Sequence, residues 1–214
     1  MKWVKGSLWA LAGLALLLAL AAAVYTTRAL PTVDGELRVA GLQQPVRVER
    51  DPHGIPTIKA QNQHDLMFAL GFVHAQDRLW QLETHRRIGA GRLSEAFGEA
   101  ALDNDRFLRA LGVRRAAAAQ WARTGPQARA VVQAYTDGIN SYLRNAMKAR
   151  PPEFVVLGLA PEPWTPEDTL AWAIMIDHAS ESTGSHGCSG TPRISISGGR
   201  ARAWFAMNAF TPSV

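Results

Sequence analysis

Apolar residues recur with helical spacing between residues 64 and 88, which predicts a long amphipathic helix ended by Gly89-Ala90-Gly91. The positions that share the predicted buried face are Leu66, Ala69, Leu70, Val73, Asp77 and Trp80. Asp77 interrupts this face, and a buried carboxylate is costly unless it is paired. We therefore expect a buried polar cluster of His74, Gln76, Asp77 and Arg78. The alternative is that Asp77 turns to the helix edge and pairs with Arg78 or Gln81 in water.

Before this helix, alternating apolar and polar residues predict strands over residues 35–50 and 55–60. The turn signal Asp51-Pro52-His53-Gly54 separates them. We expect these pieces to form a small antiparallel unit with one buried face. After the long helix, the pattern predicts further helices over residues 94–97, 103–111, 113–123, 127–147 and 167–176.

Residues 161–166 read as a rigid, proline-rich connector before the last predicted helix. Thr165 can cap that helix, Pro166 suits its first position, and Asp168 complements its dipole. The helix itself is strongly apolar, which predicts that it is buried.

Residues 1–28 are predicted to be a signal peptide or a signal anchor. Lys2 and Lys5 give a basic start, and residues 8–24 carry no charge. The lysines favour a cytoplasmic N-terminus, and Ala21-Ala22-Ala23 offers a cleavage site. Whether the segment is cleaved stays open, but in both cases the rest is exported. We expect a bacterial protein of the periplasm or anchored to the inner membrane.

The chain has 47% apolar and 19% charged residues and a net charge of +5, which is ordinary for a globular protein. Its arginines, Arg86, Arg87 and Arg92 among them, alternate with acidic residues, which favours a solvated helical surface over nucleic-acid binding. One cysteine, Cys188, excludes an internal disulfide. His74 has no second His or Cys at ligand spacing, so no metal site is expected.

Residues 184–214 lose all sustained periodicity and are expected to form a divergent, disordered tail. They are either an ordinary flexible C-terminus or a replacement for a longer chain, through truncation or a change of reading frame. We favour the replacement, because the strands before Gln61 have too few partners for a full sheet.

Several motifs occur in a recognisable order. They include Gly71-Phe72-Val73-His74-Ala75-Gln76-Asp77-Arg78-Leu79-Trp80 and the stretches 48–60, 91–95, 134–140, 151–154 and 163–168. Together they resemble the α-subunit of the penicillin acylase (penicillin amidase) family, which also includes cephalosporin and acyl-homoserine-lactone acylases. The resemblance covers residues 35–183. It implies an N-terminal-nucleophile hydrolase, made as one exported precursor that cleaves itself into α- and β-subunits. The implied fold class is α+β: the α-subunit portion of an αββα sandwich, mainly helical with a few N-terminal strands.

Family members hydrolyse linear amide C–N bonds in N-acyl compounds, including the side-chain amides of β-lactams. The resemblance implies that the nucleophile is the first serine of the β-subunit, activated by its own α-amino group. A family β-subunit opens with Ser-Asn after a Gly, and no Gly-Ser-Asn occurs here; Gly184-Ser185-His186 is a poor substitute. We therefore expect no catalytic residue in this chain and no activity without the β-subunit. Structural calcium, common in the family, is expected mostly from the β-subunit.

The resemblance places Met175 on the family's pocket methionine, His178 on a pocket arginine and Ala179 on a pocket phenylalanine. A calcium-binding glutamate of the family falls on Ser185, which has no carboxylate. Met175 could instead be ordinary core packing on an apolar helix. The polar cluster around Asp77 is interpreted as structural, and Asp77→Ala is expected to cost several kcal/mol if its partner is buried and charged.

Alternative functions are a fragment of an acyl-homoserine-lactone acylase, an α fragment that complements a separately encoded β-subunit, and a non-catalytic, membrane-tethered helical module that binds through its basic surface.

Overall fold

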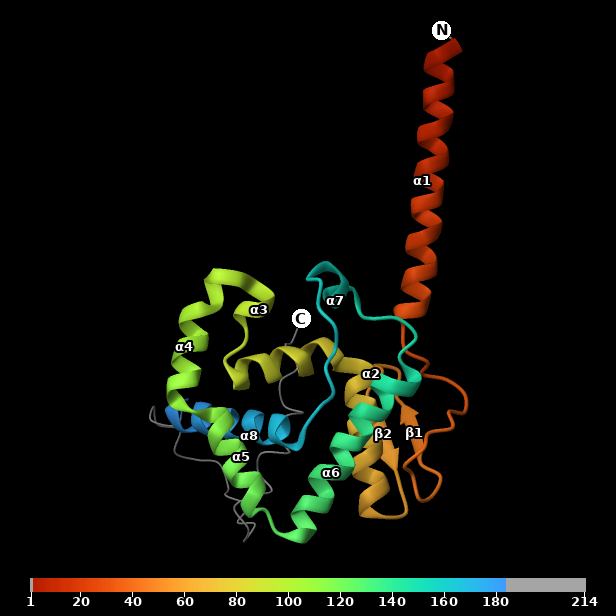
Figure 1. The fold of residues 1–214 in the computed structure, drawn as a ribbon. Helices are drawn as coiled ribbons and strands as arrows, with labels where there is room; N and C mark the ends of the chain where they lie inside the picture. The colour runs from red at the N-terminus through yellow and green to blue at the C-terminus, as the bar shows by residue number, and fades with distance from the viewer. Residues whose placement is uncertain (1, 184–214) are drawn as a thin grey trace.

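The computed structural model describes the backbone of residues 2–183 and the side chains of residues 11–176 (Figure 1). The predicted tail, residues 184–214, lies outside these described residues. The fold is mainly helical with one small antiparallel hairpin, which confirms the predicted fold class. The elements are α1 (Lys2–Ala29), β1 (Arg47–Arg50), β2 (Pro56–Lys59), α2 (Gln63–Ala90), α3 (Ser94–Phe97), η1 (Gly98–Ala101), α4 (Leu102–Leu111), α5 (Val113–Arg123), α6 (Pro126–Ser141), η2 (Tyr142–Ala146), α7 (Pro152–Val156) and α8 (Pro166–Thr183).

Helix α2 runs through the middle of the body, and α6 and α8 both pack against it (Figure 1). Helix α1 stands apart as a long rod that projects from one side of the body. The described part of α1 is exposed along nearly its whole length. Residues 11–29 are long and apolar enough to cross a membrane.

The hairpin pairs β1 with β2 in the register Arg47↔Lys59 to Arg50↔Pro56. The Asp51 carboxylate organises its turn by accepting hydrogen bonds from the backbone N–H groups of His53 (2.9 Å) and Ile55 (2.8 Å). The predicted strand over residues 35–46 is wrong. Gly35 and Gly41 in this segment have φ values of +98° and +114°, which a strand does not contain.

A buried carboxylate, Asp65, fixes the segment that precedes the hairpin. Its oxygens accept hydrogen bonds from the backbone N–H groups of Gln43 (2.8 Å) and Gln44 (2.9 Å) and from the Asn62 side chain (2.7 Å). The Asn62 side chain in turn accepts from the Asp65 N–H, which caps the start of α2. The backbone N–H groups of Gln43 and Gln44 thus bind Asp65 and are not used to pair with another strand. These two hydrogen bonds hold residues 43 and 44 against the start of α2.

Helices α2 and α6 cross in direct backbone contact at Gly71 and Gly138. A Cβ on Gly71 would lie 2.1 Å from the Tyr135 carbonyl oxygen, and a Cβ on Gly138 would lie 1.9 Å from the Phe68 carbonyl oxygen. Both distances are far inside van der Waals contact, and both neighbours are helix backbone that cannot yield. Only glycine is compatible with this crossing.

The main core surrounds this crossing. It consists of Phe72, Ala75, Leu79, Leu82, Tyr135, Ile139, Tyr142, Phe154 and Trp164. A second, smaller cluster joins α4, α5 and α8 through Leu108, Val113, Ala117 and Ala171. The single helix predicted over residues 127–147 is interrupted, because α6 ends at Ser141 and a π-helical turn follows.

We expect Gly138→Ala and Gly71→Ala each to destabilise the fold by about 3 kcal/mol or more, because the added methyl group must separate two packed helices. Chemical denaturation monitored by circular dichroism would measure this. Gly125→Ala, at the start of α6, is the matched control. No heavy atom lies within 4 Å of the position that its methyl group would occupy and its φ is −67°, so its stability should change little. Equal stability of the Gly138→Ala and Gly125→Ala variants would contradict the crossing described above.

A second prediction concerns acid stability. Burial on its own raises the pKa of the Asp65 carboxyl, but the hydrogen bonds from Gln43, His64, Asn62 and Gln44 outweigh it and lower the pKa to about 2. A lowered folded-state pKa stabilises the fold above the ordinary value near 4. That contribution is lost as the pH falls through the folded-state value.

We therefore expect Asp65→Asn to be less stable than the parent at pH 7 and the difference to shrink between about pH 4 and pH 2. Urea denaturation at a series of pH values would measure it. A stability difference that stays constant down to pH 2 would show that the ionised carboxylate is not the stabilising group.

Candidate functional site on helices α2 and α8

The polar cluster on α2 is organised by Arg50, which reaches over from β1. Its guanidinium binds both oxygens of the Asp77 carboxylate, at 2.8 Å each, and donates to the Gln76 side-chain oxygen at 3.2 Å. Gln76 also donates to the carbonyl of Thr32 at 2.6 Å. The Arg50 and Asp77 side chains are 18% and 24% exposed. The pair therefore sits at the rim of the core and joins the hairpin to α2.

The other two residues of the predicted cluster lie apart from this pair. His74 Nδ1 is 3.0 Å from the hydroxyl of Tyr135, a fully buried residue of α6. Arg78 is exposed and has non-helical backbone angles (φ −137°, ψ 30°), which mark a kink in α2. The structure thus brings Gln76 and Asp77 together through Arg50, directs His74 to α6, and leaves Arg78 facing water.

A second group of charges on α2 is buried, contrary to the solvated surface that we expected. Glu83, Arg86 and Arg87 are only 3–5% exposed. Glu83 binds both arginines, because residues three and four positions apart meet on a helix. Sequence spacing alone does not distinguish such buried pairs from exposed ones.

The same network extends beyond α2 to the connector. Glu162 accepts from Arg86 (2.9 Å), and Glu95 accepts from Arg87 (2.7 Å). Arg92 binds both glutamates, and its hydrogen bonds hold their pKa values below the ordinary range. Three arginines and three glutamates thus balance one another and fix the connector against α2 and α3.

Thr165 and Asp168 meet at the start of α8 as predicted, but the Asp168 side chain, rather than the Thr165 side chain, accepts the hydrogen bond from the backbone. The Asp168 carboxylate accepts from the Thr165 N–H and hydroxyl, both at 2.8 Å, and pairs with Arg114 of α5. Asn140 of α6 exchanges two 2.8 Å hydrogen bonds with the backbone of Trp164. The start of α8 is therefore held by α5 and α6 at once.

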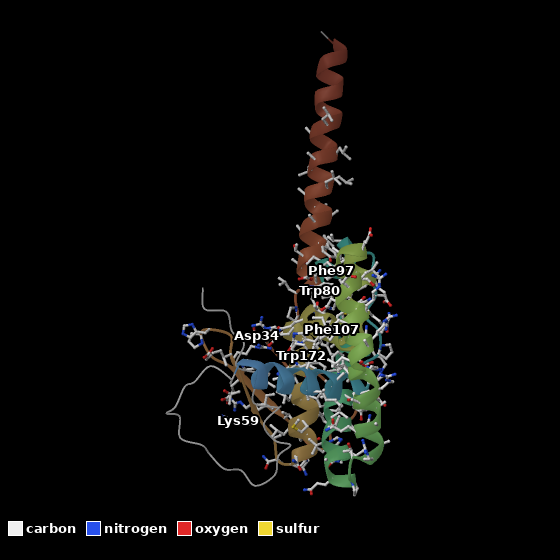
Figure 2. All side chains as sticks on the ribbon, turned by 90° about the vertical axis from the view of Figure 1, so that its left-hand side faces the viewer. Asp34, Lys59, Trp80, Phe97, Phe107 and Trp172 are labelled. Carbon is white, nitrogen blue, oxygen red and sulfur yellow. The ribbon has the colours of Figure 1, made fainter. Side chains whose placement is uncertain are left out.

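Two successive contacts form the seam between α2 and α8. In the first, the rings of His85 and Trp172 stack with centroids 3.5 Å apart and planes 6° from parallel. In the second, Gly89 lies against Ala171 and the Met175 sulfur. Trp172 is labelled in Figure 2, on the helix that the seam orients. Trp172 and Met175 are three residues apart, so they share one face of α8.

Met175 and Trp172 are both half-buried, with part of each side chain open to solvent. Met175 packs against the smaller apolar cluster. His178 and Ala179, the other predicted pocket residues, belong to α8, but their side chains lie outside the described residues. No pattern in the sequence singles out His85. Trp172 could have been noticed, because it precedes Met175 by three positions.

Burial lowers the pKa of His85 to about 4, so its imidazole is neutral at pH 7. Within the described residues its Nδ1 has no hydrogen-bond partner. The apolar surface of the seam therefore comes from Trp172 and Met175, with an uncharged His85 ring beneath the indole. Residues 11–176 contain no group of three or more His, Cys, Asp or Glu side chains arranged to hold a metal. The seam therefore offers neutral surface that can contact an apolar group.

Comparison with known proteins shows the family to which the chain belongs. Residues 45–188, more than half of the chain, match the penicillin amidase family. The chain belongs to the penicillin amidase family. It is 43% identical over 143 residues to the penicillin acylase 2 proenzyme of Pseudomonas sp. (strain SE83), covering 67% of this chain and 18% of that protein.

Two further relatives extend the comparison. The acyl-homoserine lactone acylase QuiP of Pseudomonas aeruginosa is 38% identical over 147 residues, covering 68% of this chain and 17% of that protein. The structure of a penicillin G acylase from Alcaligenes faecalis has the same fold, with a TM-score of 0.55 at 23% identity, covering 73% of this chain and all of the matched chain. The chain thus spans less than a fifth of the length of the curated relatives that it matches.

In this penicillin amidase family member, we expect Asp77→Ala to cost about 1–3 kcal/mol. This is less than the sequence suggested, because Arg50 keeps some contact with water. Thermal and urea denaturation would measure the loss. Asp103→Ala is the control, because Asp103 also pairs with an arginine, Arg106, but both are largely exposed. Its stability should change by less than about 0.5 kcal/mol, and equal losses in both variants would refute a structural role for Asp77.

Proposed function

We propose that this chain is the α-subunit region of a penicillin amidase family amidohydrolase and that α8 supplies one wall of its acyl pocket. The observation that carries the proposal is the seam on α8. Trp172 and Met175 present apolar surface on one face, and the start of the helix is fixed by Asp168, Asn140 and Arg114. A wall that selects an acyl chain must be apolar and held rigidly.

The proposed division of labour follows from the chemistry. Amide hydrolysis needs a nucleophile, a base and donors for the oxyanion. We assign all three to the β-subunit, whose first serine and α-amino group perform acyl transfer in this proposal. The role of the present chain is to bind the acyl group and orient its carbonyl. Structural calcium, where present, would be held mostly by the β-subunit.

The substrate is proposed to be an N-acyl amide, with a β-lactam side chain as the leading class. The relatives include proteins named for penicillin and proteins named for acyl-homoserine lactones. An acyl-homoserine-lactone acylase is therefore the second candidate. A non-catalytic, membrane-tethered module is the third, favoured only by the apolar α1 helix. Each predicts a different result in the assay below.

Export is part of the proposal. The basic start and apolar length of α1 suit a signal peptide or anchor, and the relatives are bacterial. We place the protein in the periplasm or on the inner membrane of a bacterium.

The proposal is tested by complementation. The chain would be co-expressed with the portion of the Pseudomonas sp. proenzyme that follows its matched segment. We expect hydrolysis of a chromogenic phenylacetyl amide only when both pieces are present. Parallel assays with acyl-homoserine lactones of increasing chain length would separate the two acylase candidates. Hydrolysis by the chain alone would contradict the division of labour, and a folded complex without activity on any acyl substrate would favour the non-catalytic module.

In the active complex, we expect Met175→Ala to change kcat/KM for the preferred acyl chain by about tenfold or more, because a shortened wall removes contact with the acyl group. Longer or bulkier acyl groups should gain relative to the preferred one. Ile174→Ala is the control, because Ile174 packs on the same apolar cluster as its neighbour. It should lower the melting temperature without changing the ranking of substrates. The same ranking in both variants would mean that Met175 only packs the core.

A further inference from the structure

Helix α1 is joined to the body by more than its chain connection. The Tyr25 hydroxyl donates a 2.9 Å hydrogen bond to the carbonyl of Arg150. A groove between the two parts is lined by residues of α1 up to Arg28 and by Lys148 and Ala149. Lys148 donates to the Thr32 hydroxyl at 2.8 Å, which fixes the chain just after α1. The helix thus leaves the body in a defined direction.

The helix also continues through the candidate cleavage site. Ala21-Ala22-Ala23 lies inside α1, which runs unbroken to Ala29. A signal peptide has an apolar core of about 7–15 residues, whereas the apolar window here is 19 residues, Leu11–Ala29. At 1.5 Å per residue, the charge-free residues 8–24 are about 26 Å long, close to the thickness of the bilayer hydrocarbon. Cleavage at Ala23 would leave Tyr25 near a new, free chain end.

The position of the bilayer then follows from the helix. If the charge-free residues 8–24 occupy the hydrocarbon, Tyr25 and Arg28 lie at the level of the lipid headgroups, where tyrosine and arginine are favoured. Lys148 and Arg150 touch the same end of α1 and lie at the same level. Both are exposed, as is Arg28. Three cations therefore surround the point at which the helix enters the body.

Exposed apolar side chains lie at the same end of the body as these cations. Helix α7 begins two residues after Arg150, and its Val155 and Val156 are 52% and 83% exposed. Phe97 of α3 is also exposed, and Trp80 links it to Phe154 of α7 through edge-to-face ring contacts. In Figure 1, α3 and α7 lie at the end of the body from which α1 leaves, with α7 nearer to the base of α1 and α3 farther from it.

We propose that α1 is retained as a membrane anchor and that the face around its base rests on the bilayer, with Arg28, Lys148 and Arg150 on anionic phospholipid headgroups and Val155 and Val156 in the interface. This surface, which we call the membrane collar, pairs cations with phosphates and places apolar side chains where the headgroups meet the acyl chains. The inference rests on the export proposed above, but it requires no acylase chemistry.

The first test concerns retention of α1. The chain would be expressed in a bacterial host and recovered from the membrane fraction, and its mass would be measured by intact mass spectrometry. We expect a mass that includes residues 2–23. A mass that corresponds to a chain starting after Ala23 would overturn the proposal that α1 is retained.

The second test concerns the collar and uses the full chain in vesicles. In a Cys188→Ser background, Val155→Cys would carry an environment-sensitive dye. Leu111→Cys is the matched control, because Leu111 is 53% exposed and ends α4, where that helix meets α5 on the side of the body away from α1 (Figure 1). The vesicles would be phosphatidylcholine with or without one part in three of phosphatidylglycerol, and a brominated lipid would serve as quencher.

We expect blue-shifted, strongly quenched emission at position 155 and water-like emission at position 111. The blue shift should grow with the phosphatidylglycerol content. Lys148→Gln or Arg150→Gln should each lower, about fivefold, the ratio of anchored protein whose collar contacts the lipid to anchored protein whose collar does not. Both variants keep the Tyr25 contact, which uses the main-chain carbonyl of residue 150, while each removes one side-chain hydrogen bond within the body, from Lys148 to Thr32 or from Arg150 to Leu159. Equal quenching at the two positions, or no dependence on phosphatidylglycerol, would overturn the collar. Because no activity is measured, failure here is distinct from failure of the proposed acylase role.

Discussion

The backbones of α2 and α6 touch because Gly71 and Gly138 have no side chains, and the rest of the body depends on this contact. The crossing places His74 on the buried hydroxyl of Tyr135 and holds α2 at a fixed angle in the centre of the fold. Asp65 near the start of α2 holds the chain before the hairpin, and Asp77 at the middle of α2 holds the hairpin itself. The other end carries His85 and Gly89, against which α8 packs. One close approach thus connects the scaffold to the candidate pocket wall.

Local signals in the sequence were sufficient for most helices. The extent of α2 and its end at Gly91 are determined by residues a few positions apart, so the pattern predicts them. The buried face predicted for α2 is only partly right, because Ala69 and Val73 are buried but Leu66 is 40% exposed. The predictions that failed concern contacts between residues that are far apart in the sequence. Asp77 pairs with Arg50, 27 positions earlier, and no helical periodicity can indicate that partner. The strand predicted before residue 47 fails because Asp65 recruits the backbone donors of Gln43 and Gln44, which a strand would have used.

The buried charges show a different limit of sequence patterns. Glu83, Arg86 and Arg87 have the spacing of ordinary surface ion pairs, and the connector and α3 supply further acidic partners for the two arginines. Burial is tolerated because every charge finds an opposite one, with Glu95 and Glu162 completing the balance. The candidate pocket residues are a similar case. The resemblance singled out Met175, but the stack of His85 on Trp172 depends on how α8 lies across α2.

The proposed membrane anchor and the proposed acyl wall are compatible in one structure because they lie at different levels along the axis of α1. Along the axis of α1, α7 lies next to the base of the helix, and α8 lies further from it (Figure 1). A bilayer at the level of Tyr25 therefore covers α7 and leaves the exposed parts of Trp172 and Met175 in water. A soluble N-acyl amide could reach the seam without leaving the aqueous phase, whereas a long acyl chain would be delivered from the nearby membrane surface. Tethering at this distance would raise the local concentration of amphiphilic substrates without burying the wall that selects them.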